Sequence, residues 1–157
     1  MNIAIVGSTG QLGTDLMKVF QDEHVIIGLT HQDLEVTDSN SCLILKKHHP
    51  NIIINTAAFH KTDQCEEEPL KTFSVNAIGA RNIATTSKEI KATTIFISTD
   101  YVFDGSKNKP YTEDDIPNPI NTYGISKLAG ELYTKQNPKH YIIRLASLFG
   151  VAGASGK

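Results

Sequence analysis

The chain is poor in several residue types that mark whole classes of protein. Among its 157 residues it has no tryptophan, two cysteines and only two arginines, Arg81 and Arg144. Its formal net charge is -2 and its pI is near 6.3, so it offers no basic face of the kind that nucleic acid or an anionic membrane requires. We therefore expect neither nucleic acid nor a membrane among its partners.

The two cysteines, Cys42 and Cys65, form no CxxC pair and have no histidine pattern beside them. This favours reduced thiols over a disulfide scaffold or a zinc site. We expect both to pack as small apolar side chains in a cytoplasmic protein. The chain opens without a basic segment, and no apolar run has the length of a membrane-spanning helix, so neither a signal peptide nor a transmembrane segment is predicted.

What the chain does contain is a regular alternation of β-rich runs and helix-length segments. The predicted strands are Asn2–Val6, His24–Leu29, Asn51–Asn55, Thr93–Ser98 and Tyr141–Ala146. The predicted helices are Gln11–Gln21, Ser39–His49, Pro69–Ile90 and Pro119–Gln136, the last after a loop at Asp104–Asn118. Strands that are apolar almost throughout belong to parallel sheets covered on both faces. The pattern predicts an α/β fold with a doubly wound, Rossmann-like parallel sheet.

Size and composition indicate one domain. A chain of 157 residues with 39% hydrophobic side chains is enough for a single globular core. We expect residues 1–150 to form a dinucleotide-binding domain that also carries the catalytic residues. Residues 151–157 read as the start of a loop into a substrate-binding portion that the chain does not contain.

A glycine-rich turn follows the first predicted strand, with Gly7, Gly10 and Gly13 in GxxGxxG spacing. At such a strand-to-helix turn the free N–H groups of the helix attract phosphate, and glycines let a pyrophosphate approach. A turn that binds nothing is the alternative. An acid directly after the second strand would favour NAD, but none occurs before Asp33, so the sequence favours NADPH, with NADH as the alternative.

A tyrosine and a lysine four residues apart, Tyr123 and Lys127, lie in the last predicted helix. This spacing places them on one helix face. A nearby ammonium would lower the pKa of the phenol, which could then protonate a carbonyl during its reduction. Thr99, at the carboxyl end of the Thr93–Ser98 strand, could hydrogen-bond the same oxygen. A YxxxK pair alone is common and often structural; its joint occurrence with the glycine turn predicts a carbonyl reductase.

These residues resemble the extended short-chain dehydrogenase/reductases and, within them, the dTDP-4-dehydrorhamnose reductase family. The segments that carry the resemblance are Gly7–Gly13, Asn55–Ala58, Asp63–Glu66, Val75–Ala77, Ser98–Gly105, Pro110–Asp115 and Tyr123–Glu131. It implies NADPH-dependent reduction of the 4-keto group of a dTDP-6-deoxy-hexulose to dTDP-L-rhamnose, with a nucleotide sugar as substrate. A homodimer is compatible with it. It also implies that members continue beyond residue 157 into a portion that supplies much of the sugar pocket.

The resemblance also implies roles for individual residues. Thr99, Tyr123 and Lys127 would be catalytic, and Thr99 and Asp100 would face the sugar. Cofactor contacts would come from Gly7, Gly10, Gln11, Leu12, Gly13, Thr30, Glu35, Val36, Ala57, Ala58, Tyr123 and Lys127. Some members bind a divalent metal at a subunit contact, but no metal is predicted here, because any partners of Asp15 would lie beyond the end of this chain.

Four residues bear on how closely the chain follows the family pattern and on which reaction it supports. Glu35 stands where the family usually has aspartate, and Ser147 where many members have tryptophan. Asn76 is either a residue near the active site or a polar residue on a helix surface. Tyr101 replaces the glutamate that related dehydratases need for elimination, which favours plain reduction. A nucleotide-sugar epimerase, or a non-catalytic partner protein like the regulatory subunit of methionine adenosyltransferase, remains an alternative.

Overall fold

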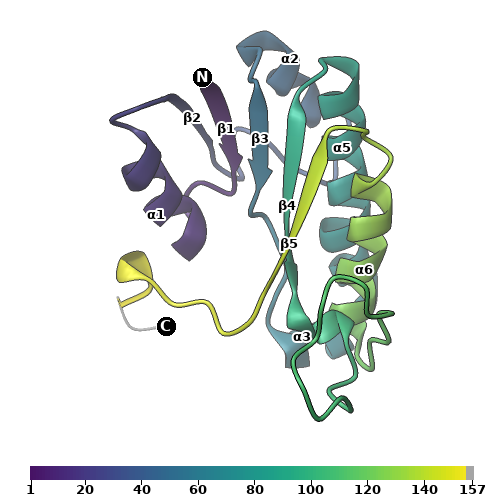
Figure 1. The fold of residues 1–157 in the computed structure, drawn as a ribbon. Helices are drawn as coiled ribbons and strands as arrows, with labels where there is room; N and C mark the ends of the chain where they lie inside the picture. Colours follow the sequence, from purple (N-terminus) through teal and green to yellow (C-terminus); the bar gives the residue numbers. More distant parts are fainter. Residues whose placement is uncertain (155–157) are drawn as a thin grey trace.

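The computed structural model describes residues 1–154 as a parallel sheet with helices on both faces (Figure 1). The strands are β1 (Asn2–Val6), β2 (Val25–Leu29), β3 (Ile52–Asn55), β4 (Thr93–Thr99) and β5 (His140–Leu145). Their order across the sheet is β2-β1-β3-β4-β5, and every neighbouring pair is parallel. The direction of winding reverses between β1 and β3, the place where open α/β sheets bind ligands at the carboxyl ends of their strands. The predicted doubly wound fold is confirmed.

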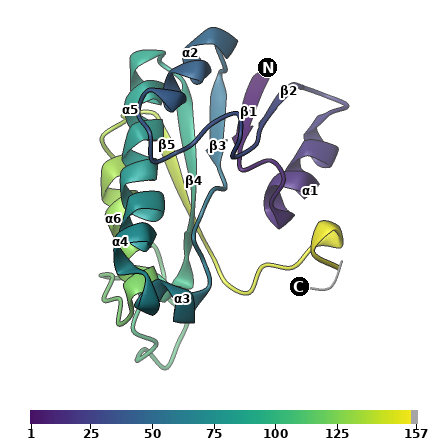
Figure 2. The same cartoon turned by 180° about the vertical axis from the view of Figure 1, so that it is seen from behind.

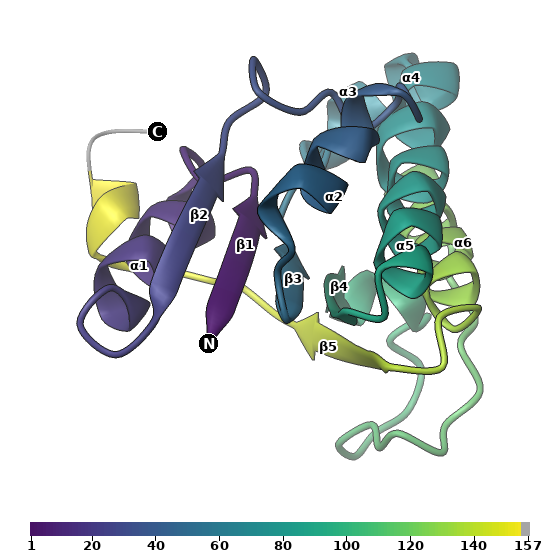
Figure 3. The same cartoon turned by 90° about the horizontal axis from the view of Figure 1, so that it is seen from above.

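Alternation of side chains along the inner strand β1 explains why both faces of the sheet are covered. Ala4 and Val6 of β1 face a buried cluster that includes Leu45 and Ile83, while Ile3 and Ile5 face a second cluster. Successive side chains of a strand point to opposite faces, so one apolar run supplies both clusters. Seen from above in Figure 3, α1 lies on one face of the sheet, and α2, α5 and α6 lie on the other.

The helices follow the predicted ranges with four differences. They are α1 (Gln11–Phe20), α2 (Ile44–His48), α3 (Thr62–Glu67), α4 (Pro69–Phe73), α5 (Ala80–Glu89) and α6 (Thr122–Thr134), with short 3-10 turns η1 (Ser41–Leu43) and η3 (Asp100–Val102) and a π-type turn η2 (Ser74–Gly79). The first difference is α3, which was not predicted. Two others are the late starts of α2 and α6. The fourth is η2, which divides the predicted helix Pro69–Ile90 into α4 and α5. None of the described helices has both the length and the apolar character needed to cross a bilayer.

The late start of α6 has a local cause. The Asn121 side chain accepts a hydrogen bond from the Gly124 N–H at 2.7 Å, which makes Asn121 the N-cap. A capping side chain satisfies a free N–H of the first turn and fixes where the helix begins. Residues 119–121 therefore stay in the loop, and Tyr123 falls in the first turn of α6.

The chain after β5 runs back across the molecule to α1, as Figures 1 and 2 both show. The Ala152 N–H donates to the Asp15 carboxylate at 3.2 Å, and the Gln11 side chain donates to the Leu148 carbonyl at 3.3 Å. The predicted loop at residues 151–157 is a short 3-10 turn, η4 (Val151–Ala154), in its described part. Residues 155–157 lie outside the described residues.

Candidate functional site

A cavity of about 1160 Å³ opens at the carboxyl ends of the strands. The glycine-rich turn after β1 lines one part of it, the loop after β2 a second part, and Thr99, Asp100 and Tyr123 a third. Residues that are far apart in the sequence therefore share one pocket at the point where the sheet changes its winding direction. This pocket is the candidate active site.

The glycine-rich turn is shaped so that no side chain fills it. Gly7 has a φ of 82°, which residues with a Cβ rarely adopt, and a Cβ there would lie 2.9 Å from the Thr56 hydroxyl. A Cβ on Gly13 would lie 2.9 Å from the Ser8 Cα. The N-cap of α1, Gly10, makes no side-chain capping bond, so the first N–H groups of the helix face the cavity without a side-chain partner. These features fit the pyrophosphate of a dinucleotide.

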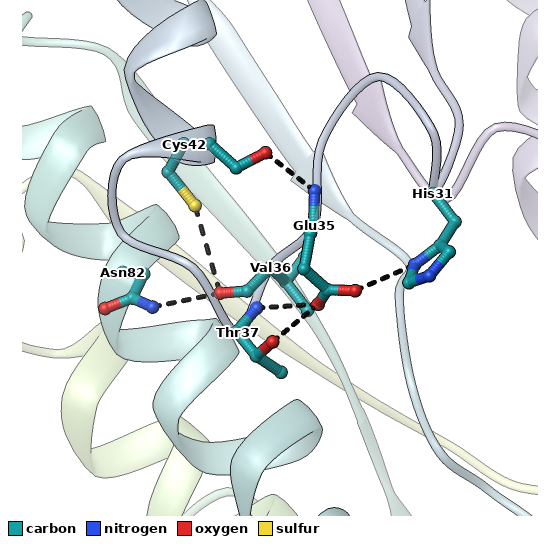
Figure 4. Close-up of polar contacts among 7 residues, drawn as sticks. His31, Glu35, Val36, Thr37, Cys42 and Asn82 are labelled. Carbon is teal, nitrogen blue, oxygen red and sulfur yellow. Dashed lines mark hydrogen bonds and ion pairs between the residues drawn. The ribbon is translucent and has the colours of Figure 1, made fainter.

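The loop after β2 forms the wall that adjoins the glycine turn, and Figure 4 shows its polar contacts. Oε1 of Glu35 accepts from the Thr37 N–H at 2.9 Å and from the Thr37 hydroxyl at 2.8 Å, while Oε2 lies 3.2 Å from Nδ1 of His31. Partial burial acts to raise the pKa of Glu35, but the bonds from Thr37 and the proximity of His31 outweigh it and the net pKa is lowered. Glu35 is therefore an anchored carboxylate.

The acid nearest the end of β2 turns away from the cavity. Oδ2 of Asp33 accepts from the Thr30 N–H at 2.9 Å and from the Thr30 hydroxyl at 2.6 Å. Neither residue lines the cavity, although Thr30 was predicted to lie near the adenosine. The reason is that this aspartate closes the turn of its own loop, and this occupies the Thr30 hydroxyl.

At the other end of the cavity, Tyr123 is half-buried beside Thr99, and its ring meets that of Tyr101 edge-on at 5.7 Å. The Thr99 hydroxyl donates to the Asp100 carboxylate at 3.1 Å. Burial raises the pKa of Tyr123, and the Thr99 hydroxyl opposes this only in part. The phenol is therefore protonated and able to donate.

Lys127 does not line the cavity, and its ammonium contacts two residues of β4. It is 2% exposed; Nζ donates to the Ile97 carbonyl at 2.6 Å and lies 4.2 Å from the centre of the Phe96 ring. Burial lowers the pKa of Lys127 to about 7, and the carboxylate of Glu131 opposes that shift. The Tyr123 pKa was expected to be lowered by this ammonium; instead it is raised, and burial of the phenol is the largest cause.

Sequence reasoning missed a buried ionic network behind these residues. The carboxylate of Glu131, 0% exposed, receives two bonds from Arg144, at 2.9 and 2.7 Å, and one from the Ser98 hydroxyl at 2.6 Å. Glu131 lies one helical turn after Lys127, so the spacing was visible in the sequence. What the sequence could not show is that β5 brings Arg144 to the same carboxylate.

Two further polar residues hold α6 in place. Asn76 is 1% exposed; it bonds the N–H and the carbonyl of Phe59, at 2.9 and 2.8 Å, and the Ser126 hydroxyl at 3.0 Å. The reading of Asn76 as a helix-surface residue is therefore excluded. Glu66 lies in the last turn of α3 and accepts from the Thr122 N–H at 2.7 Å.

Three comparisons with known proteins address the family. The family model described as the RmlD substrate binding domain matches residues 1–156. The chain belongs to this family. It is 38% identical over 156 residues to the spore coat polysaccharide biosynthesis protein SpsK of Bacillus subtilis, covering 98% of this chain and 55% of that protein.

Two solved dTDP-4-dehydrorhamnose reductases superpose closely on this member of the RmlD family. The one from Clostridium acetobutylicum is 40% identical with a TM-score of 0.94, covering 96% of this chain and 55% of its own. The one from Bacillus anthracis, in complex with NADP, is 39% identical with a TM-score of 0.92, covering 95% and 54%. The chain therefore spans about half the length of the relatives that it matches, and the resemblance inferred from its motifs is confirmed.

Within this RmlD-family chain, the cavity collects most of the residues predicted for the site. Those that line it are Gly7, Gly10, Gln11, Leu12, Gly13, Glu35, Val36, Ala57, Ala58, Thr99, Asp100 and Tyr123. Thr30 and Lys127 do not line it. Cys42 and Cys65 are free and buried, as predicted. Within residues 1–154 no group of three or more histidine, cysteine, aspartate or glutamate side chains could hold a metal ion, and Asp15 bonds the η4 backbone.

Proposed function

We propose that this chain is the dinucleotide-binding and catalytic part of an NADPH-dependent reductase of a nucleotide sugar. The proposed reaction is reduction of the 4-keto group of a dTDP-6-deoxy-hexulose to dTDP-L-rhamnose. The observation that carries the proposal is the single cavity that joins the glycine turn to Thr99 and Tyr123. Membership of the RmlD family and the NADP complex of the Bacillus anthracis reductase support it.

The residues present fit the cofactor. The open turn around Gly7 and Gly13 and the free N–H groups of α1 would hold the pyrophosphate, and the loop around Glu35 would meet the adenosine. Held by these residues, NADPH would provide the hydride for reduction of the carbonyl carbon. NADH is the alternative donor.

The protein's own contribution is a proton and its placement. Because the Tyr123 phenol is protonated and lines the cavity, it can deliver its proton to the carbonyl oxygen as negative charge develops there. Thr99, bonded to Asp100, would orient the same oxygen. Lys127 would stabilise the tyrosinate left behind through its positive charge, which the neighbouring carboxylate of Glu131 favours.

The test is the variant Tyr123→Phe, assayed with NADPH and dTDP-4-dehydrorhamnose. Loss of one hydroxyl should leave NADP⁺ affinity within about twofold and reduce turnover by about 10²–10⁴-fold, the usual contribution of a general acid. NADPH oxidation and product formation measure turnover, and calorimetry measures binding. Turnover equal to that of the wild type would contradict the role of this tyrosine.

One observation favours a second candidate, a nucleotide-binding partner protein without catalysis. The Lys127 ammonium is buried against the Ile97 carbonyl instead of facing the cavity. If that arrangement persists with the dinucleotide bound, Lys127 stays outside the cavity and makes no contact with the dinucleotide. Dinucleotide binding by the wild type without any reduction, and no effect of Tyr123→Phe, would support this candidate.

A further inference from the structure

His31 occupies the position at which a Rossmann-type protein reads the 2′ group of the adenosine ribose. That group lies at the end of the strand next to the glycine turn, and here the strand is β2, which ends at Leu29. The side chains of the loop after β2 differ in what they contact. Asp33 folds back onto Thr30, whereas His31 lines the cavity with 82% of its side chain exposed.

The contact with Glu35 decides which nitrogen of His31 carries a proton. Nδ1 of His31 lies 3.2 Å from Oε2 of Glu35 (Figure 4). The lowered pKa of Glu35 keeps it ionised, and an ionised carboxylate only accepts hydrogen bonds, so Nδ1 must be the protonated nitrogen. In the neutral ring Nε2 is then an acceptor, and no bond to Nε2 from any of the described residues is found.

The two protonation states of this ring suit two different ligands. Neutral His31 presents the lone pair of Nε2, which can accept a hydrogen bond from a ribose 2′-hydroxyl. Protonated His31 presents an Nε2–H and a positive charge, which can donate to a 2′-phosphate. Proteins use histidine as a charge switch at physiological pH.

We propose that His31, held by Glu35, discriminates between the 2′-phosphate of NADPH and the 2′-hydroxyl of NADH, and that binding the phosphate takes up a proton on its ring. The proposal rests on the proposed function, because it requires a dinucleotide in the cavity. It goes beyond it by naming the specificity residue and by making cofactor preference depend on pH. Glu35 fixes the ring orientation and, as an anion, also weakens phosphate binding when the ring is neutral.

Other ionisable groups near His31 lie on its own loop and on the other walls of the cavity. On its own loop these are Glu35 and Asp38, the second of which acts on Glu35, while Asp33 is bonded to Thr30. Ionisable side chains reach the same cavity from the other walls: His60, Lys61, Lys71, Asp100, Tyr101 and Tyr123. Of these, His60 is the one other imidazole, and it provides a matched control.

The experiment measures binding of NADP⁺ and NAD⁺ by calorimetry at pH 6.5 and pH 8, for the wild type, His31→Gln and His60→Gln. In the wild type, the ratio of NADP⁺ affinity to NAD⁺ affinity should fall by roughly fivefold to tenfold over this range, since one proton changes affinity by at most about tenfold per pH unit. His31→Gln should abolish the fall, and His60→Gln should keep it. The 2′-phosphate itself, with a second pKa of about 6, titrates with the opposite sign in every variant.

Proton uptake is a second readout that does not involve turnover. NADP⁺ titrations at pH 7 in buffers of different ionisation enthalpy should show net proton uptake by the wild type that is absent in His31→Gln. An affinity ratio that stays constant with pH while both dinucleotides bind overturns the role of His31 and leaves the proposed function intact. Failure of the wild type to bind either dinucleotide overturns both. Because His31 is largely exposed, its replacement should not unfold the protein, which a melting curve checks.

Discussion

Replacement of Lys127 by methionine should stabilise the protein, although Lys127 is proposed to be catalytic. Its ammonium is fully buried, and burial lowers its pKa from 10.5 to about 7. At about 1.4 kcal/mol per pH unit, this difference means that the charged form costs the folded state roughly 5 kcal/mol. Methionine removes the charge but also the bond to the Ile97 carbonyl, whose loss costs about 1–3 kcal/mol. The net gain at pH 6 is about 2–4 kcal/mol.

The sign of the pH dependence follows from proton counting. Below about pH 7 the lysine is protonated in both states, so the full cost is present. Between about pH 7 and 10.5 the unfolded chain holds a proton that the folded chain has lost, so the wild type gains stability as the pH rises. Above 10.5 the cost has gone, and Lys127→Met should no longer be the more stable protein.

Urea unfolding at pH 6 and pH 10, followed by circular dichroism because the chain has no tryptophan, measures this difference. Burial also raises the pKa values of Tyr123 and Cys42, so the folded chain keeps those protons longer and loses stability at high pH. These contributions are common to both proteins and cancel in the difference. Lys88→Met, at an exposed position, is the control and should show no change with pH. An equal stability difference at pH 6 and pH 10 for Lys127→Met would refute the reasoning.

Two further predictions concern packing and the ionic network. Arg144→Met should destabilise the fold by about 3–5 kcal/mol, because it leaves the fully buried Glu131 carboxylate without its charged partner. Glu131→Gln should destabilise the fold by about 1–2 kcal/mol less than Arg144→Met, because the Arg144 side chain is 21% exposed and water can hydrate it. Urea unfolding compares the two, and a reversed order would contradict this view. Gly13→Ala should weaken NADP⁺ binding by at least about tenfold in calorimetry, because its Cβ would press on the Ser8 backbone at 2.9 Å; unchanged affinity would show that the turn does not contact the dinucleotide.

The fold was predictable because its signals are local. Continuous apolar runs identified all five strands to within one or two residues, and the order of elements implied a parallel sheet. The helix boundaries were harder, since they depend on partners elsewhere. Pro69 at the first position of α4 separates it from α3. Because Asn121 caps α6, that helix begins three residues after the proline at which it was expected to begin.

Site residues could be predicted where the backbone conformation requires a particular residue type. They could not be predicted where a side chain has several possible hydrogen-bond partners. Gly7 and Gly13 could be assigned because only glycine fits the turn. Thr30 could not, because its hydroxyl is equally suited to a ligand and to Asp33, and the turn of its own loop takes it. Lys127 was placed on the correct helix face, but its long side chain ends at a backbone carbonyl that no sequence pattern encodes.

The α6 helix shows how these placements depend on one another. Tyr123, Lys127 and Glu131 are spaced by four residues and so share one helix face, yet their environments differ. The phenol lines the cavity, the ammonium donates to the Ile97 carbonyl of β4, and the carboxylate accepts from Arg144 of β5. Burial lowers the pKa of the lysine, and the carboxylate one turn away raises it again, so its charge near neutral pH is a balance of the two. Arg144 and Ser98 fix that carboxylate, so they would influence the charge of Lys127 and, through it, the proton transfer proposed for Tyr123.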